Sequence, residues 1–139
     1  MNASLELLKI KIELTMNANH LINEDEIPEL LGQEFPLINE RLERTASISN
    51  IYQSIQCFAD FTKQLIRNGN MKEVKHCFKI ADKMLLEGNS TVKNAIENCY
   101  VYSMATILDA TTPLSKMIKE ILPASLFKEY RHQVNASGI

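Results

Sequence analysis

The sequence predicts an all-α fold, a compact antiparallel bundle of five to seven helices, and three observations support this prediction. Apolar residues recur every three or four positions in three consecutive stretches between Asn50 and Asp109, which is the spacing that collects them on one side of a helix. The turn-forming runs Asn68-Gly69-Asn70 and Gly88-Asn89-Ser90 separate these stretches. The composition, with 45% apolar and 23% charged residues, is typical of a globular protein.

The N-terminal segment, residues 5–16, is the part whose secondary structure the pattern leaves open. From residue 8 to residue 16, apolar and polar residues alternate, and the apolar ones are Leu8, Ile10, Ile12, Leu14 and Met16. This two-residue period is that of a half-buried strand, yet no partner strand is evident in the rest of the chain. We therefore expect this segment to be either a helix or a lone strand, and such a strand would pair with a strand of a second copy in a homodimer. We expect a single domain, residues 1–139, in which residues 1–23 form a less certain extension.

Residues 24–44 predict one broken helix or two short helices. Pro28 and Pro36 both fit the first turn of a helix, where the missing N–H group costs no hydrogen bond. Gly32 lies between them, and residues 45–50 form a capping loop. We expect the buried side of this region to be supplied by its apolar residues, Leu30, Leu31, Phe35, Leu37, Ile38 and Leu42.

Three helices follow, and their ends are marked by capping residues. Asn50 and Gln53 have the spacing of a capping box, in which two side chains satisfy free backbone N–H groups of the first turn. Gly69 suits the left-handed residue that ends such a helix, and Gly88 is expected to end the second helix in the same way. The third helix, from about Thr91, is apolar on nearly all sides after Cys99, which predicts a central position.

Two further predictions concern packing and the C-terminal region. Phe58 and Phe78 lie on the apolar faces of the first two central helices, so we expect both in one core. Thr112-Pro113 opens a helix that Pro123 ends, and a short last helix follows.

Two sequence motifs resemble a family of small all-helical bacterial proteins of unknown function. The first is Glu34-Phe35-Pro36-Leu37 followed by Leu42, and the second is Val92-Lys93-Asn94-Ala95-Ile96-Glu97-Asn98 at the start of an apolar helix. The resemblance covers about residues 25–132. It implies an all-helical fold and a bacterial source, and it offers no catalytic residue to carry over.

Charge is distributed unevenly along the chain, although the formal net charge is only −2. Residues 1–46 contain nine acidic and four basic residues, and the acidic ones concentrate at Glu24, Asp25, Glu26 and Glu29. An acidic surface favours association with a basic partner. We therefore interpret these four residues as a partner-binding surface, with toxin neutralisation as one form of this function.

A second charged feature is a stripe of lysines on the second central helix, Lys72, Lys75, Lys79 and Lys83, beside His76. Such a stripe can follow a phosphate backbone. Flanking arginines and stacking aromatic residues are missing from the stripe, and the isoelectric point is about 5.9. The stripe is interpreted as a solvated outer face, and nucleic acid is not the expected partner.

Residues with catalytic or metal-binding spacing are missing from the sequence. The three histidines are far apart, and no glycine-rich phosphate loop is present, so we predict no metal and no cofactor. The three cysteines have no Cys-x-x-Cys spacing and are expected to be free buried thiols. An enzyme or a small-molecule binder with a pocket near Tyr100, Tyr102 and Cys99 is the alternative function.

The longest apolar runs are far shorter than a membrane-spanning helix, and the N-terminus lacks the pattern of an export signal. The expected location is the cytoplasm, with no membrane contact. Whether the chain is an enzyme is left undecided, although the sequence favours a non-catalytic protein that binds a protein partner or a second copy of itself.

Overall fold

A computed structural model describes residues 5–9, 20–46 and 50–136 of the chain. The described residues confirm the all-α fold, with the following α-helices: α2 (Ile27–Glu34), α3 (Asn39–Ala46), α4 (Ile51–Arg67), α5 (Met71–Glu87), α6 (Ser90–Ala95), α7 (Tyr102–Leu108), α8 (Pro113–Ile121) and α9 (Ala124–Ala136). Short 3-10 helices occupy Glu24–Glu26 and Pro36–Ile38. A π-helical segment, Ile96–Val101, joins α6 to α7 without a break, so residues 20–46 and 50–136 contain seven continuous α-helical rods.

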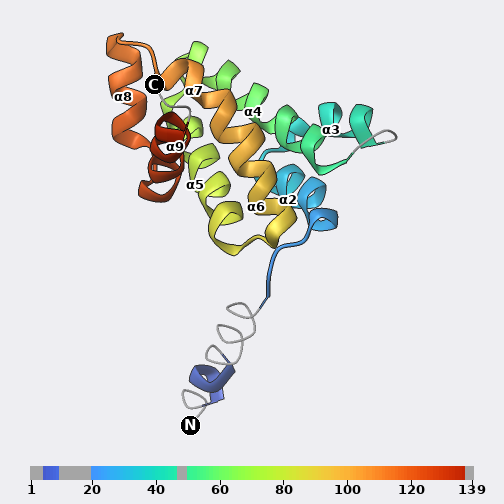
Figure 1. Cartoon of the computed structure of the whole chain (residues 1–139). Helices are drawn as coiled ribbons and strands as arrows, with labels where there is room; N and C mark the ends of the chain where they lie inside the picture. Colours follow the sequence, from blue (N-terminus) through green and yellow to red (C-terminus); the bar gives the residue numbers. More distant parts are fainter. Residues whose placement is uncertain (1–4, 10–19, 47–49, 137–139) are drawn as a thin grey trace.

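The helices form a bundle around the continuous α6–α7 rod (Figure 1). The π segment of this rod packs against α4, α5 and α9. In Figure 1, α2 and α3 lie on one side of the central helices, whereas α8 and α9 lie on the other. The rod contacts α4, α5, α8 and α9, as expected of a central helix, but one side of it, with Asn94, Asn98, Tyr102 and Thr106, is exposed.

The core contains the aromatic residues that the apolar pattern places there. Phe58 and Phe78 are both fully buried in one core, as predicted. The ring of Phe58 stacks on Tyr100 at 4.8 Å between centroids and lies 5.4 Å from the ring of Phe35. Each such aromatic pair adds about 0.5–1.5 kcal/mol beyond the burial of its area.

One buried hydrogen-bond chain links α4 to the π segment. The Tyr100 hydroxyl and the Thr62 hydroxyl lie 2.9 Å apart, and the Thr62 hydroxyl also donates to the carbonyl oxygen of Phe58 at 2.9 Å. Burial raises the pKa of Tyr100 well above its usual value, so this phenol stays protonated. These hydrogen bonds provide partners for two polar side chains that would otherwise be costly to bury.

The turns around α5 show one correct prediction and one wrong prediction. Gly69 has a φ of 74°, the left-handed conformation predicted for it. Gly88 has a φ of −74° and a ψ of 156°, so the predicted left-handed end of α5 is wrong. Glycine is needed at this position for a different reason: a Cβ atom there would lie 2.5 Å from Cγ1 of Val92 and would overlap the carbonyl oxygen of Met84.

The other capping predictions agree with the structure. The Asn50 side chain accepts a hydrogen bond from the backbone N–H of Gln53 at 3.1 Å. Pro28 and Pro36 occupy the first turns of α2 and of the 3-10 helix Pro36–Ile38, so the region forms two short helices, α2 and α3. Thr45 and Ala46, expected in the capping loop, are instead the last residues of α3, and residues 47–49 of that loop lie outside the described residues.

At the C-terminal side, Thr112 caps α8 by accepting a hydrogen bond from the N–H of Ser115 at 3.1 Å. Helix α8 ends at Ile121, before Pro123, as predicted. The last helix, α9, extends from Ala124 to Ala136 and is longer than expected. It is tied to the end of α7 by a hydrogen bond that the Tyr130 hydroxyl donates to the carboxylate of Asp109.

Residues 5–9 are helical, which settles that part of the ambiguous N-terminal segment, whereas residues 10–16 lie outside the described residues. The chain is described again from His20, where an extended stretch passes the α5–α6 turn. There Ile22 forms an isolated parallel bridge with Gly88. The N–H of Ile22 donates to the carbonyl oxygen of Glu87 at 2.9 Å, and the N–H of Asn89 donates to that of Ile22 at 2.8 Å.

In the described part of the chain, no helix has both the length and the apolar character needed to cross a bilayer.

Candidate functional site

The acidic cluster lies at the entrance to α2. Glu24, Asp25 and Glu26 form a 3-10 helix that leads directly into α2, and Glu29 lies in the first turn of α2. The Asn23 side chain caps this entrance by accepting a hydrogen bond from the N–H of Asp25 at 3.0 Å. Acidic side chains are favoured at a helix N-terminus because they face its partial positive charge. Part of the acidic cluster therefore stabilises the helix itself.

The four carboxylates differ in exposure and in their contacts. Glu26 is half-buried, and its two carboxylate oxygens lie 2.9 and 3.1 Å from Nε2 of His20. Glu24, Asp25 and Glu29 are exposed, and none of them forms an ion pair with a lysine or arginine in the described part of the chain. These three carboxylates are therefore open to a cation from outside the chain.

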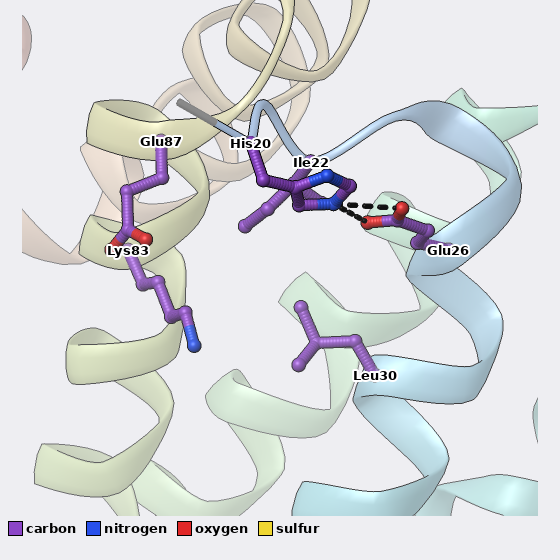
Figure 2. Close-up of a pocket in the computed structure, with 6 residues that line it drawn as sticks. All are labelled: His20, Ile22, Glu26, Leu30, Lys83 and Glu87. Carbon is purple, nitrogen blue, oxygen red and sulfur yellow. Dashed lines mark hydrogen bonds and ion pairs between the residues drawn. The ribbon is translucent and has the colours of Figure 1, made fainter. Parts of the chain in front are cut away.

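A pocket of about 280 Å³ lies beside the acidic cluster, between α2, α5 and the extended stretch from His20 to Asn23. We call it the α2–α5 pocket. Figure 2 shows Lys83 and Glu87 on the α5 side, with Glu26 and Leu30 on the opposite side and His20 and Ile22 above. Four of its six lining side chains are polar or charged, and two are aliphatic.

A second cavity of about 480 Å³ continues along α5 and shares Lys83 and Glu87 with the α2–α5 pocket. Its remaining lining residues are Glu34, His76, Lys79, Ile80, Asp82 and Leu86. Nε2 of His76 lies 3.0 Å from a carboxylate oxygen of Glu34, which ties α5 to the end of α2. Burial raises the pKa of Asp82, one of whose oxygens is buried without a hydrogen-bond partner among the described residues.

The lysine stripe is solvent-exposed throughout, because Lys72, Lys75, Lys79 and Lys83 are all exposed. Its structure thus agrees with a solvated outer face. In the sequence, the stripe and the acidic cluster are separate features. The fold, however, places Lys83 across a pocket from Glu26. The pocket residues His20, Ile22 and Glu87 were missed, because no local pattern signals the bridge between Ile22 and Gly88.

The pocket expected near Tyr100, Tyr102 and Cys99 is a wrong prediction. Tyr100 is fully buried and Tyr102 is 70% exposed, because residues two apart on a helix point in nearly opposite directions. The cavity beside Tyr100 has a volume of only about 10 Å³ and is lined mainly by aliphatic side chains. The described residues therefore leave no room for a ligand at this position.

The cysteines are free thiols, as expected, and Cys77 is buried whereas Cys57 and Cys99 are half-buried. Burial raises the pKa of all three thiols, and that of Cys77 reaches about 12. Such thiols are poor nucleophiles at neutral pH. Among the described residues, no three His, Cys, Asp or Glu side chains come together in a group able to hold a metal ion.

Comparison with known proteins identifies a family for this chain. Neither the curated proteins nor the solved structures gave a match. A family model described as "Domain of unknown function (DUF7674)" matches residues 28–136, which include α2 to α9 apart from the first residue of α2. This match confirms the resemblance to an uncharacterised family of small helical proteins. Because it spans most of the sequence, the chain belongs to the family Domain of unknown function (DUF7674).

Proposed function

We propose that this protein is a non-catalytic module that binds a basic protein partner through the acidic cluster Glu24, Asp25, Glu26 and Glu29. The observation that carries the proposal is the set of three exposed carboxylates, Glu24, Asp25 and Glu29, without a lysine or arginine partner in the described part of the chain. Clustered charges of one sign speed up encounter with an oppositely charged surface and select against the wrong partner.

The position of the cluster supports the proposal further. The carboxylates lie on the 3-10 helix Glu24–Glu26 and on the first turn of α2, whose buried residues Ile27 and Leu31 hold it in the core. The neighbouring Leu21 is 56% exposed and offers an apolar contact beside the charges. A rigid helix end with one exposed apolar side chain keeps the ordering cost of binding small. In our proposal the protein acts in the bacterial cytoplasm, and neutralisation of a basic toxin is one form of this role.

The test is a capture experiment with two charge-matched variants. The first variant carries Glu24→Gln, Asp25→Asn and Glu29→Gln, and the control carries Asp60→Asn, Glu73→Gln and Glu120→Gln on α4, α5 and α8. Three lost ion pairs of ordinary strength should weaken a captured partner by roughly 10- to 100-fold. The control should bind like the parent, and parental binding should weaken as salt is raised.

Equal binding by both variants would contradict the proposal, because it would show that the acidic cluster does not contact the partner. Light scattering on the purified protein separates the homodimer from a foreign partner. A dimer that persists in the first variant would place self-association on another surface.

A further inference from the structure

The α2–α5 pocket carries an inference of its own, independent of the acidic cluster except for Glu26. It is lined by one ammonium group, one imidazole and two carboxylates, together with two aliphatic side chains: His20, Ile22, Glu26, Leu30, Lys83 and Glu87. The extended stretch borders the pocket from above, and its backbone is bonded to the α5–α6 turn. The pocket is therefore built from three separate parts of the chain.

Its four polar side chains fall into two groups. His20 and Glu26 satisfy each other through the contacts of 2.9 and 3.1 Å between the imidazole nitrogen and the carboxylate. Lys83 and Glu87 are one helical turn apart, yet neither forms an ion pair with any residue that the structure describes. One ammonium group and one carboxylate thus line the same pocket with their charges uncompensated by the described protein.

A ligand that compensates both charges must carry both signs itself. A simple carboxylate would pair with Lys83 and meet the negative charge of Glu87, whereas a simple amine would have the opposite problem. The volume of about 280 Å³ lies near the lower end of the range of small-molecule pockets in proteins. This is the space of a small molecule.

The apolar part of the lining restricts the ligand further. Ile22 is buried, with 7% of its surface exposed, and Leu30 is half-buried, so the two form a small aliphatic surface beside the charges. An aliphatic group placed there is removed from water, which favours a ligand with an aliphatic side chain.

We propose that the α2–α5 pocket binds a free α-amino acid with an aliphatic side chain. Its carboxylate pairs with Lys83, its ammonium group pairs with Glu87, and its side chain contacts Ile22 and Leu30. His20 and Glu26, held together, form the rim of the pocket rather than the charge contacts. The proposal adds a small-molecule site to a protein whose proposed partner is another protein.

The experiment is an NMR titration of the full-length protein with L-leucine, following backbone amide signals. Saturable shifts of the Ile22 and Leu30 amides are expected. Lys83→Met and Glu87→Gln should each weaken binding about fivefold, the upper end of the range for one exposed ion pair. The matched controls Lys72→Met and Glu73→Gln, on the same helix but outside the pocket, should bind like the parent.

Two analogues test the need for both charges. 4-Methylpentanoate lacks the ammonium group and 3-methylbutylamine lacks the carboxylate, so both should bind at least about fivefold more weakly than L-leucine. The proposal is overturned by an absence of saturable shifts up to the solubility limit of L-leucine. It is also overturned if either analogue binds as tightly as L-leucine, or if Lys83→Met behaves like Lys72→Met. None of these outcomes bears on capture by the acidic cluster, so the two proposals fail separately.

Discussion

The central helices and the α2–α5 pocket both contain polar side chains, but these side chains serve different purposes in the two regions. Between α4 and the α6–α7 rod, the buried hydroxyl groups of Thr62 and Tyr100 are paired with each other. In the α2–α5 pocket, Lys83 and Glu87 line the wall, and neither has an ion-pair partner among the described residues. The difference indicates that the first region provides stability, whereas the second has charges available to a ligand or partner.

The largest effect should come from the centre of the core. Phe58→Ala and Phe78→Ala are each expected to lower the free energy of unfolding by about 3–5 kcal/mol, because both side chains are fully buried and leave a cavity. Urea denaturation measures the loss. Leu37, which the sequence pattern wrongly places on the buried side of its segment, is 85% exposed, whereas its neighbour Ile38 faces the core. Leu37→Ala therefore serves as the control and should change stability by less than about 0.5 kcal/mol. Losses below about 1 kcal/mol for both phenylalanines would show that this region is not the main source of stability.

An intermediate effect is expected where the two regions meet, at the α5–α6 turn. Gly88→Ala should destabilise the protein by about 1–3 kcal/mol, because the added methyl group overlaps the Met84 carbonyl and Val92. Faster hydrogen exchange of the Ile22 and Asn89 amides, which bond across this turn, is the specific readout.

Gly32→Ala is the matched control for this prediction. The added methyl group would meet only the exposed side chain of Asn39, which can move aside, and alanine favours the helical backbone. It should therefore leave the exchange of the Ile22 and Asn89 amides unchanged. Unchanged stability and exchange in Gly88→Ala would mean that the turn tolerates a side chain and does not hold the extended stretch.

The smallest effect is expected on the outer face of α5. Replacing Lys72, Lys75, Lys79 and Lys83 together with Gln should change the free energy of unfolding by less than about 1 kcal/mol, because all four are exposed. Oligonucleotide titration at low salt provides the functional check. If the parent binds with a steep salt dependence and the variant does not, the stripe is a nucleic-acid surface and our interpretation is wrong.

Much of the fold was predictable because helices depend on local spacing. The apolar pattern placed Phe58 and Phe78 in the core, and the positions of Pro28 and Pro113 marked the starts of α2 and α8. The conformation of Gly88 was not predictable in the same way. Glycine serves both a left-handed turn and a close approach, and the residue alone does not distinguish the two.

The site was predictable only in part. The acidic cluster is contiguous in the sequence, so Glu24, Asp25, Glu26 and Glu29 were visible as a group, although binding through them stays a prediction. Tyr100 and Tyr102 are also close in the sequence, yet their side chains separate into the core and the solvent. Closeness in sequence therefore identifies a shared surface only where the helix face is known.

The sequence by itself determined the all-α class, most helix ends and the main core residues, since these follow from interactions within a few positions along the chain. Only the tertiary structure decided that His20 pairs with Glu26, that Ile22 bonds to the α5–α6 turn, and that Lys83 and Glu87 complete a pocket there. The physical reason is that this pocket depends on a contact between Ile22 and Gly88, residues far apart along the chain. Such contacts form when packing brings distant segments together, and no local periodicity encodes them.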